Sequence, residues 1–324
     1  MKKILVTGAG GFIGSHLTEL LVKEGLDIKA FVHYNSINNW GWLEKSEVKD
    51  EVEIITGDIR DYDSVYNAIQ GCKAVFHLAA LIGIPYSYVS PLAYIKTNIE
   101  GTYNVLQASK ELGLAQVLVT STSETYGTAQ YVPIDEKHPM VGQSPYSASK
   151  IAADQLAISY FRSFNLPVKI VRPFNTYGPR QSARAIIPTV ISQMLSGKRT
   201  IKLGNITPTR DLTFVKDTCQ GFLEMYKSNK LLGEITNIGM KNEITVENLV
   251  NRIADLLGKK IVVESEDQRV RPANSEVERL LSDNTKLIMN TNWKPNYDLG
   301  KGLTETIEWL KKNRELYKIE IYNV

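Results

Sequence analysis

The chain has 324 residues, of which 43% are hydrophobic and 23% are charged, and its formal net charge at pH 7 is +3. These proportions are typical of a folded globular protein and exclude the disordered and fibrous classes. So small a net charge gives no reason to expect a nucleic acid or a membrane surface as a partner.

The two cysteines, Cys72 and Cys219, are too few for a disulfide framework and are not spaced as metal ligands. They favour a reducing compartment. The first apolar run, Ile4-Leu5-Val6, is too short for a signal peptide and is followed by glycines, and no later apolar stretch reaches spanning length. We therefore expect a cytoplasmic protein that holds no metal ion.

The chain opens with a pattern of strand, glycine turn and helix. Residues 3–7 form an apolar run, Gly8, Gly11 and Gly14 follow, and residues 15–23 have apolar side chains at helical spacing. The early glycines permit a tight turn and the approach of a pyrophosphate to the backbone, and the last permits close packing of the helix. Because the helix N-terminus would face the phosphates, the pattern predicts a dinucleotide site.

The second predicted strand, 28–32, bears on the choice between NAD and NADP. NAD-binding proteins usually place an acid at this strand end to bind the ribose 2′-hydroxyl. Here the strand ends in His33-Tyr34-Asn35-Ser36, without a carboxylate to repel a 2′-phosphate and without an arginine to bind one. The choice stays open, and His33 is equally well explained as a half-exposed strand-end residue.

Two more strands are predicted at 52–60 and 74–80. The first carries Asp58-Ile59, which suits contact with an adenine, although Asp58 could instead cap the helix predicted at 62–69. The second is apolar, as expected of a strand covered on both faces, and its end at Ala79-Ala80 leaves room for a cofactor. His77 within it is more typical of a buried structural histidine than of a catalytic one.

A helix at 91–112 and a fifth strand at 117–122 follow. The helix has Pro91 in its first turn and apolar residues at 92, 95, 99 and 106, which is helical spacing. The strand delivers Thr122-Ser123-Glu124 at its carboxyl end, which is where open parallel sheets bind ligands. We therefore expect chemistry at this edge of the sheet.

Tyr146 and Lys150 are four residues apart in a helix predicted to start at Ser144. They would lie on one face, one turn from each other. An ammonium group beside a phenol favours the phenolate, so Lys150 should lower the pKa of Tyr146 from about 10 and make it a general base. Alone, the pair could be a surface tyrosine beside a solvated lysine. The dinucleotide pattern upstream favours the catalytic interpretation.

Taken in this order, the motifs resemble the extended short-chain dehydrogenases/reductases of the nucleotide-sugar epimerase/dehydratase type over nearly the whole sequence. The resemblance implies an α/β fold with a Rossmann-like doubly wound parallel sheet in residues 1–175, completed by part of 210–240, and a smaller α/β substrate-binding domain in 176–324. It implies NAD or NADP, tightly bound and regenerated in each cycle. The implied cofactor contacts are Gly8, Gly11, Phe12, Ile13, Gly14, His33, Asn35, Asp58, Ile59, Leu78, Ala79, Ala80, Tyr146, Lys150 and Pro173.

The same resemblance implies that Tyr146, Lys150 and Thr122 oxidise a sugar at C4. A 4,6-dehydratase must also remove the C5 proton and expel the C6 hydroxyl, which needs an acid/base, and Glu124 with Ser123 stands in the right place. Thr-Ser-Glu matches GDP-mannose 4,6-dehydratases and departs from the Thr-Asp-Glu of related enzymes. Decarboxylases of the UDP-glucuronate type share Thr-Ser-Glu, so a decarboxylase, a 4-epimerase and, more distantly, a non-catalytic NAD(P)-binding regulator remain alternatives.

In the carboxyl-terminal half the resemblance implies substrate contacts, namely Asn175, Arg180, Arg210 and Arg271, because guanidinium groups suit a diphosphate. Segments 35–43, 128–134 and 180–188 are most similar to N-acetylhexosamine 4,6-dehydratases of legionaminic acid biosynthesis. This favours GDP-N-acetylglucosamine as the substrate. Members of the family commonly form homodimers through helices that here correspond to 91–112 and 144–164.

Overall fold

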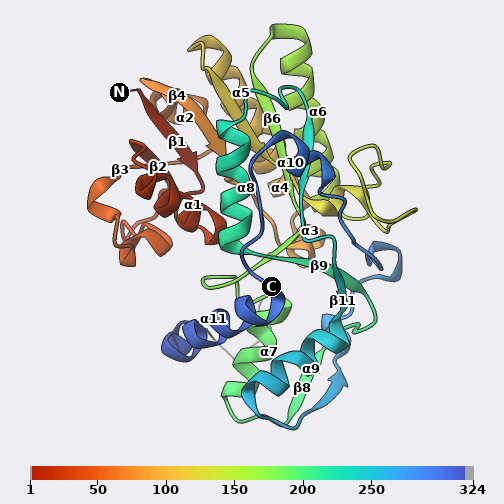
Figure 1. The fold of residues 1–324 in the computed structure, drawn as a ribbon. Coiled ribbons are helices and arrows are strands. Elements are labelled where there is room, and N and C mark those ends of the chain that lie inside the picture. Colours follow the sequence, from red (N-terminus) through yellow and green to blue (C-terminus); the bar gives the residue numbers. More distant parts are fainter. Residues whose placement is uncertain (1, 318–324) are drawn as a thin grey trace.

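The computed structural model describes residues 2–317. Its main sheet has seven strands in the order β10-β6-β5-β4-β1-β2-β3, and every neighbouring pair is parallel (Figure 1). The predicted α/β fold is therefore confirmed. The strands are β1 Lys3–Thr7, β2 Ile28–His33, β3 Glu53–Gly57, β4 Cys72–His77, β5 Gln116–Thr120, β6 Val168–Pro173 and β10 Ile235–Ile238.

Helices cover both faces of this sheet. Alternate side chains of a strand point to opposite faces, so Ile4 and Val6 belong to one hydrophobic cluster and Leu5 to another. The first cluster lies under α1 and α8, and the second lies under α2, α5 and α6. These helices are α1 Phe12–Lys23, α8 Val215–Lys227, α2 Tyr62–Ile69, α5 Gly101–Glu111 and α6 Pro145–Phe164.

Smaller sheets and helices form the lower part of the molecule in Figure 1. The order β11-β9-β7 makes a three-stranded sheet, and β12 pairs with β8. The strands are β7 Asn175–Tyr177, β8 Thr200–Leu203, β9 Thr209–Phe214, β11 Glu243–Thr245 and β12 Val262–Ser265. The helices are α7 Ile186–Leu195, α9 Val246–Leu257, α10 Thr285–Asn290 and α11 Leu299–Lys312, and α10 instead contacts β10 of the main sheet. Short 3-10 turns are η1 Gly41–Lys45, η2 Lys49–Glu51, η4 Ser123–Tyr126, η5 Asp267–Arg269, η6 Ala273–Ser275 and η7 Arg314–Leu316.

The helix predicted at 91–112 is present over residues 91–111, but one part of it is π-helical. The structure has α3 Ile84–Val89, α4 Pro91–Tyr94, a π-helical segment η3 Ile95–Glu100, and then α5. The Asn98 side chain in the π-helical segment bonds both backbone groups of Leu81, with its Oδ1 and Nδ2 each 2.9 Å from the partner atom. π-Helical turns often mark functional sites. Here the π-helical segment coincides with the contact between Asn98 and Leu81.

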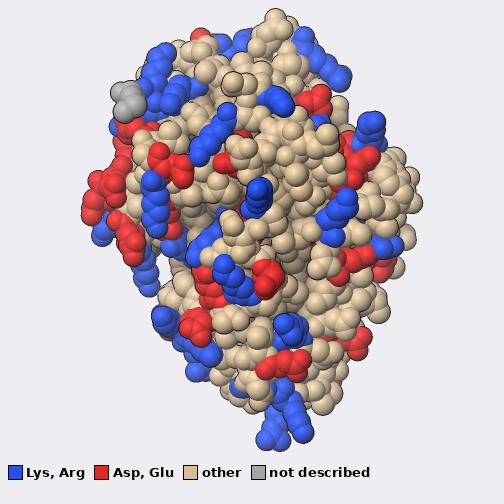
Figure 2. All heavy atoms as spheres, viewed as in Figure 1, with Lys and Arg blue, Asp and Glu red and all other residues tan. Residues whose placement is uncertain are grey.

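The surface carries charges of both signs. Lysine and arginine side chains are interspersed with aspartate and glutamate over the face seen in Figure 2. Between residues 2 and 317, no helix combines the length and the apolar character that crossing a membrane would require.

Candidate active site

The glycine turn lies where the strand order reverses, between β1 and β4, and there Thr7 pairs with His77. Gly8 has a φ of +69°, and a Cβ on it would meet the Ala79 nitrogen at 2.8 Å. A Cβ on Gly11, the residue that precedes α1, would meet only the Gly8 oxygen, at 3.2 Å. The turn is therefore tight behind Gly8 and open at Gly11, next to a helix N-terminus, which fits the phosphates of a dinucleotide.

Segment 35–43 packs on the back of this turn. The Trp42 amide donates to the Gly10 carbonyl over 2.9 Å, and the Trp42 ring meets Trp309 edge to face with centroids 5.4 Å apart. The Asn35 amide is used within the segment: its Oδ1 accepts from the Asn39 N–H at 2.9 Å and its Nδ2 donates to the Asn39 carbonyl at 2.7 Å. Asn35 thus shapes the loop beside the turn.

Asp58 follows β3 and binds Arg60, whose backbone N–H and Nε both lie 2.9 Å from its Oδ1. This bond to Arg60 lowers the pKa of the Asp58 carboxyl. The cap of α2 is Asp61, which accepts from the Asp63 N–H at 3.0 Å, so Asp58 does not cap that helix. Ile59 is buried, and His33 is exposed at the end of β2.

His77 is the centre of a buried chain of hydrogen bonds that the sequence did not predict. Its Nδ1 lies 2.8 Å from the Thr7 hydroxyl and its Nε2 lies 3.0 Å from the Thr102 hydroxyl. Thr102 donates its proton to the Asn98 carbonyl at 2.6 Å, so Nε2 of His77 must be the protonated nitrogen. Burial lowers the pKa of His77 to about 3, which keeps the ring neutral.

This chain of hydrogen bonds joins the glycine turn to α6. The Leu78 and Ala79 amides donate to the Thr7 hydroxyl, each over 3.1 Å. At the far end, Asn98 Nδ2 donates to the Ser149 hydroxyl over 2.9 Å, and Ser149 is the residue before Lys150. The sequence signal that could have revealed it is Asn98, a polar side chain inside an otherwise helical apolar pattern.

The five candidate catalytic residues converge at the carboxyl end of β5. Helix α6 begins at Pro145 after the cap Ser144, which places Tyr146 in its first turn and Lys150 one turn later. Thr122 precedes the 3-10 turn η4, which carries Ser123 and Glu124. Tyr146, Lys150 and Glu124 are only 7%, 4% and 8% exposed. Thr122 hydrogen-bonds to Tyr146 through its side chain.

The electrostatics of Tyr146 differ from the prediction. Its pKa is raised, chiefly by burial and in part by Glu124 and Asp154, while the hydrogen bond from Thr122 lowers it. Lys150 directs its ammonium to the Thr120 carbonyl, 2.6 Å away, and burial lowers the pKa of Lys150. In this arrangement the hydrogen bond of the Lys150 ammonium goes to the end of β5.

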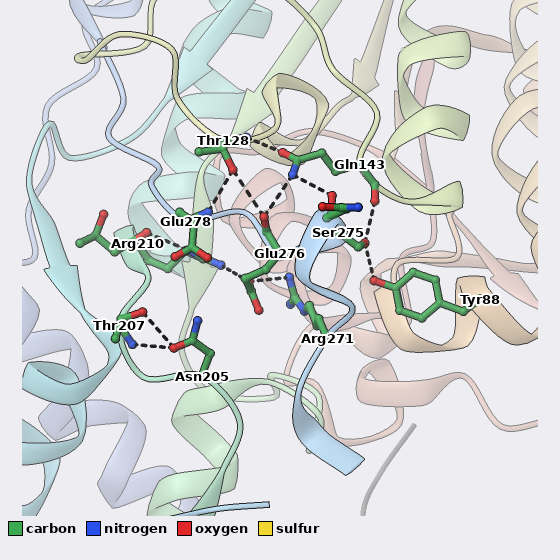
Figure 3. A network of polar contacts seen from close by, with 12 residues as sticks. Tyr88, Thr128, Gln143, Asn205, Thr207, Arg210, Arg271, Ser275, Glu276 and Glu278 are labelled. Atoms are coloured by element: carbon green, nitrogen blue, oxygen red, sulfur yellow. Dashed lines mark hydrogen bonds and ion pairs between the residues drawn. The ribbon is translucent and has the colours of Figure 1, made fainter. Parts of the chain in front are cut away.

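Arg210 and Arg271 meet at one carboxylate, Glu276 (Figure 3). The distances from Glu276 Oε1 are 3.2 Å to Arg210 Nη2 and 3.4 Å to Arg271 Nη1. Arg210 is also close enough to Glu124 for that carboxylate to counteract the lowering of its pKa by burial. The two guanidinium groups thus meet at Glu276, and Arg210 also lies near Glu124. Glu276, which holds them, was not predicted because nothing local to it in sequence indicates this pairing.

Asn175 and Arg180 differ in their relation to this pair, because Asn175 of β7 pairs with Leu212 of β9, two residues from Arg210. Arg180 binds α1, with its Nη2 at 2.8 Å from Glu19 and its Nη1 at 3.1 Å from the Ser15 hydroxyl. Arg180 thus links its loop to α1, and its assignment as a substrate contact stays a prediction. The buried Oδ1 of Asn175 has no hydrogen-bond partner within the described residues. Pro173, at the end of β6, pairs with Ile238 of β10.

Residues 5–306 match the family described as GDP-mannose 4,6 dehydratase. The chain belongs to this family. It is 30% identical over 315 residues to a dTDP-glucose 4,6-dehydratase of Streptomyces antibioticus, covering 96% of this chain and 93% of the relative. It is 32% identical over 325 residues to a UDP-N-acetyl-alpha-D-glucosaminuronate decarboxylase of Bacillus cytotoxicus, covering 96% and 98%.

A solved structure is similar over nearly the whole chain. The UDP-glucuronic acid 4-epimerase of Bacillus cereus, in complex with UDP-glucuronic acid and NAD, superposes with a TM-score of 0.87 at 28% identity, covering 96% of this chain and 99% of that one. These three proteins are named for different reactions although their similarity to this chain is nearly equal. Membership therefore establishes a nucleotide-sugar enzyme scaffold, and the reaction must be argued from the site.

Proposed function

We propose that the protein is an NAD(P)-dependent nucleotide-sugar 4,6-dehydratase that converts a nucleotide-activated N-acetylhexosamine to its 4-keto-6-deoxy derivative. The observation that carries the proposal is the buried carboxylate of Glu124, which is close enough to Tyr146 to affect the pKa of its phenol. Epimerisation at C4 needs only one acid/base, whereas dehydration needs a second one for C5 and C6. The resemblance of segments 35–43 and 180–188 makes GDP-N-acetylglucosamine our first choice of substrate.

The residues of the glycine turn, Gly8, Gly11 and Gly14, would hold the cofactor pyrophosphate, and Ala79 and Ala80 would line its path to Tyr146. A bound nicotinamide would supply the redox chemistry, as acceptor of the hydride lost from C4 of the sugar and as donor of the hydride gained by C6. Its positive charge would also favour the phenolate of Tyr146 and so oppose the effect of burial. We leave both NAD and NADP in the proposal, because neither an acid nor an arginine ends β2.

Tyr146 takes the proton of the C4 hydroxyl, while Thr122 holds the C4 oxygen and Lys150 holds the ribose. The resulting ketone acidifies the C5 hydrogen, and Glu124 removes it as a proton. The C6 hydroxyl then leaves as water, with a proton from Glu124 or Ser123, and C5 regains a proton when C6 is reduced. The sugar loses one water overall, and the cofactor ends as it began. Arg210 and Arg271 would bind the substrate diphosphate.

A decarboxylase is the second candidate. The relative from Bacillus cytotoxicus is named for this reaction, and a nucleotide-sugar uronate would lose carbon dioxide once C4 is oxidised. The same Tyr146 and Thr122 would serve, and Glu124 would then act at C5 alone.

Product mass distinguishes the candidates. The purified protein, without added cofactor, is incubated separately with GDP- and UDP-N-acetylglucosamine, GDP-mannose, UDP-glucuronate and UDP-N-acetylglucosaminuronate, and each product is weighed by mass spectrometry. We expect loss of one water from GDP-N-acetylglucosamine, and no reaction from the variant Tyr146→Phe. Loss of carbon dioxide from a uronate would replace the proposal by the decarboxylase, and an unchanged mass with an altered sugar would replace it by the epimerase.

We further propose that the protein is a cytoplasmic homodimer. Each chain would divide near residue 175 into a cofactor-binding domain and a substrate-binding domain. Cys72 and Cys219 are buried free thiols, which suits a reducing compartment. Leu92 and Ile95, on the helical segment before α5, are 60% and 50% exposed, and Phe164 at the end of α6 is 51% exposed. These apolar side chains support an interface formed by the 91–112 and 144–164 segments.

A further inference from the structure

A buried ion pair lies directly behind the candidate catalytic residues. Arg172 of β6 and Asp154 of α6 have side chains with no exposed area, and Arg172 Nη2 lies 2.6 Å from Asp154 Oδ2. Breaking such a pair is costly, yet replacing both partners by apolar residues is often neutral or stabilising. Asp154 Oδ1 and Arg172 Nη1 have no hydrogen-bond partner within residues 2–317, so the pair is not an optimal stabilising device. Its presence calls for another explanation.

The pair contacts both ends of the turn that carries the candidate catalytic residues Thr122, Ser123 and Glu124. Before the turn, the Ser121 hydroxyl donates to Asp154 Oδ2 at 2.6 Å and accepts from Arg172 Nε at 3.1 Å. At the end of the turn, the Arg172 guanidinium stacks over the Tyr126 ring, 4.4 Å from its centroid. Ser121 and Tyr126 are themselves buried, so neither end can move without disturbing Arg172.

The same pair connects this turn to α6. Asp154 is four residues after Lys150, so the two side chains leave the helix on the same face. Lys150 bonds the Thr120 carbonyl, and Asp154 bonds the next residue, Ser121. Helix α6 and the carboxyl end of β5 are therefore joined at two successive residues, and β6, which supplies Arg172, lies beside both.

We propose that Asp154 and Arg172 are positioning residues for the reaction: they hold the 121–126 turn, with Thr122 and Glu124, in fixed register with the helix that presents Tyr146 and Lys150. The inference rests on the proposed function only for its kinetic readout. Misplacement of reacting groups by about 1 Å can cost on the order of 10²-fold in rate, without loss of substrate binding. The two residues touch neither sugar nor cofactor in this role.

The test compares the single variant Asp154→Asn, the apolar double variant Asp154→Leu/Arg172→Met, and a control, Lys169→Met. Lys169 is a second buried cation of β6, but its Nζ donates to the Met225 carbonyl at 2.6 Å, away from the turn. For each variant, kcat and KM are measured with the sugar that the wild type converts, together with the bound cofactor, the melting temperature and hydrogen exchange of the backbone amides of residues 121–127.

We expect the double variant to fold, to keep its cofactor and its KM, to lose about 10²-fold in kcat and to exchange the 121–127 amides on the order of tenfold faster. Asp154→Asn should show the same losses, and Lys169→Met neither. Native kcat and native exchange in the double variant would overturn the inference. So would failure of the double variant to fold, since the pair would then serve folding alone. If the wild type converts no sugar, the proposed function fails, and hydrogen exchange still decides this inference.

Discussion

Glu124 is the side chain by which a dehydratase differs from a C4 epimerase at this site. Its place beside Tyr146 and Arg210 is a consequence of the short turn η4, which begins directly after Thr122. A carboxylate there can remove the C5 proton, and a carboxamide of the same shape cannot. In the proposed dehydratase reaction, the chemistry after C4 oxidation would therefore depend on Glu124.

Glu124→Gln should lower the rate of water loss by about 10²–10⁴-fold, the usual contribution of a general acid or base, while the bound cofactor is retained. Product mass and cofactor content of the purified variant measure the two quantities. Glu247→Gln, on the exposed side of α9, is the control and should behave as the wild type. Retained dehydration in Glu124→Gln would contradict the assigned role.

Thr122 controls the proton affinity of Tyr146. Burial raises the pKa of Tyr146 and the hydrogen bond from Thr122 lowers it. In the proposed reaction the phenolate of Tyr146 is the active form. Thr122→Val removes the hydrogen bond, so the pKa of Tyr146 should rise. The increase of kcat with pH, the rising limb of the profile, should therefore move to higher pH. Thr122→Ser keeps the hydroxyl and should keep the limb in place. A pH profile of kcat for the three proteins checks this, and an acid shift in Thr122→Val would refute it.

Helix α6 was predictable because its signals are local. Ser144 caps it, with its hydroxyl accepting from the Ser147 N–H at 3.1 Å, and Pro145 occupies the first turn. The helix predicted at 91–112 is also present, but its π-helical segment was not predicted, because that segment is accompanied by contacts of Asn98 with Leu81 and Ser149, outside the segment. Local propensity carries no record of such contacts.

The cap of α6 gives a matched test at the scale of one element. Thr245 caps α9 with the same kind of bond, to the Asn248 N–H at 3.1 Å, but α9 carries no candidate catalytic residue. Ser144→Ala and Thr245→Ala should each lower the free energy of unfolding by about 1 kcal/mol. Only Ser144→Ala should also lower kcat, since Tyr146 lies in the turn that Ser144 caps. Chemical denaturation and kinetics check this, and equal kinetic losses would contradict it.

At the scale of the whole molecule, the sequence predicted the motif residues and missed their distant partners. Tyr146 and Lys150 are recognisable from a spacing of four, and the glycine turn from its flanking strand and helix. Glu276 and Arg210 are 66 residues apart, and Asp154 and Arg172 lie on different elements, so each pairing exists only after the main sheet and the smaller sheets have formed. The contact of Arg180 with Glu19, 161 residues away in sequence, was missed for the same reason.

The proposed homodimer would use the exposed apolar side chains of the 91–112 and 144–164 segments. The prediction placed Leu92 and Ile95 on the apolar stripe of one helix, yet both point to solvent, while Leu106 further along is buried. Burying such side chains contributes about 25 cal/mol for each Å² of apolar surface, and a charge among them would oppose it. Leu92→Glu/Ile95→Glu should therefore shift the protein from dimer to monomer in analytical ultracentrifugation. Met289→Glu, an exposed apolar residue of α10, should leave the mass unchanged. A monomeric wild type, or a double variant that remains dimeric, would show that this surface is not the interface.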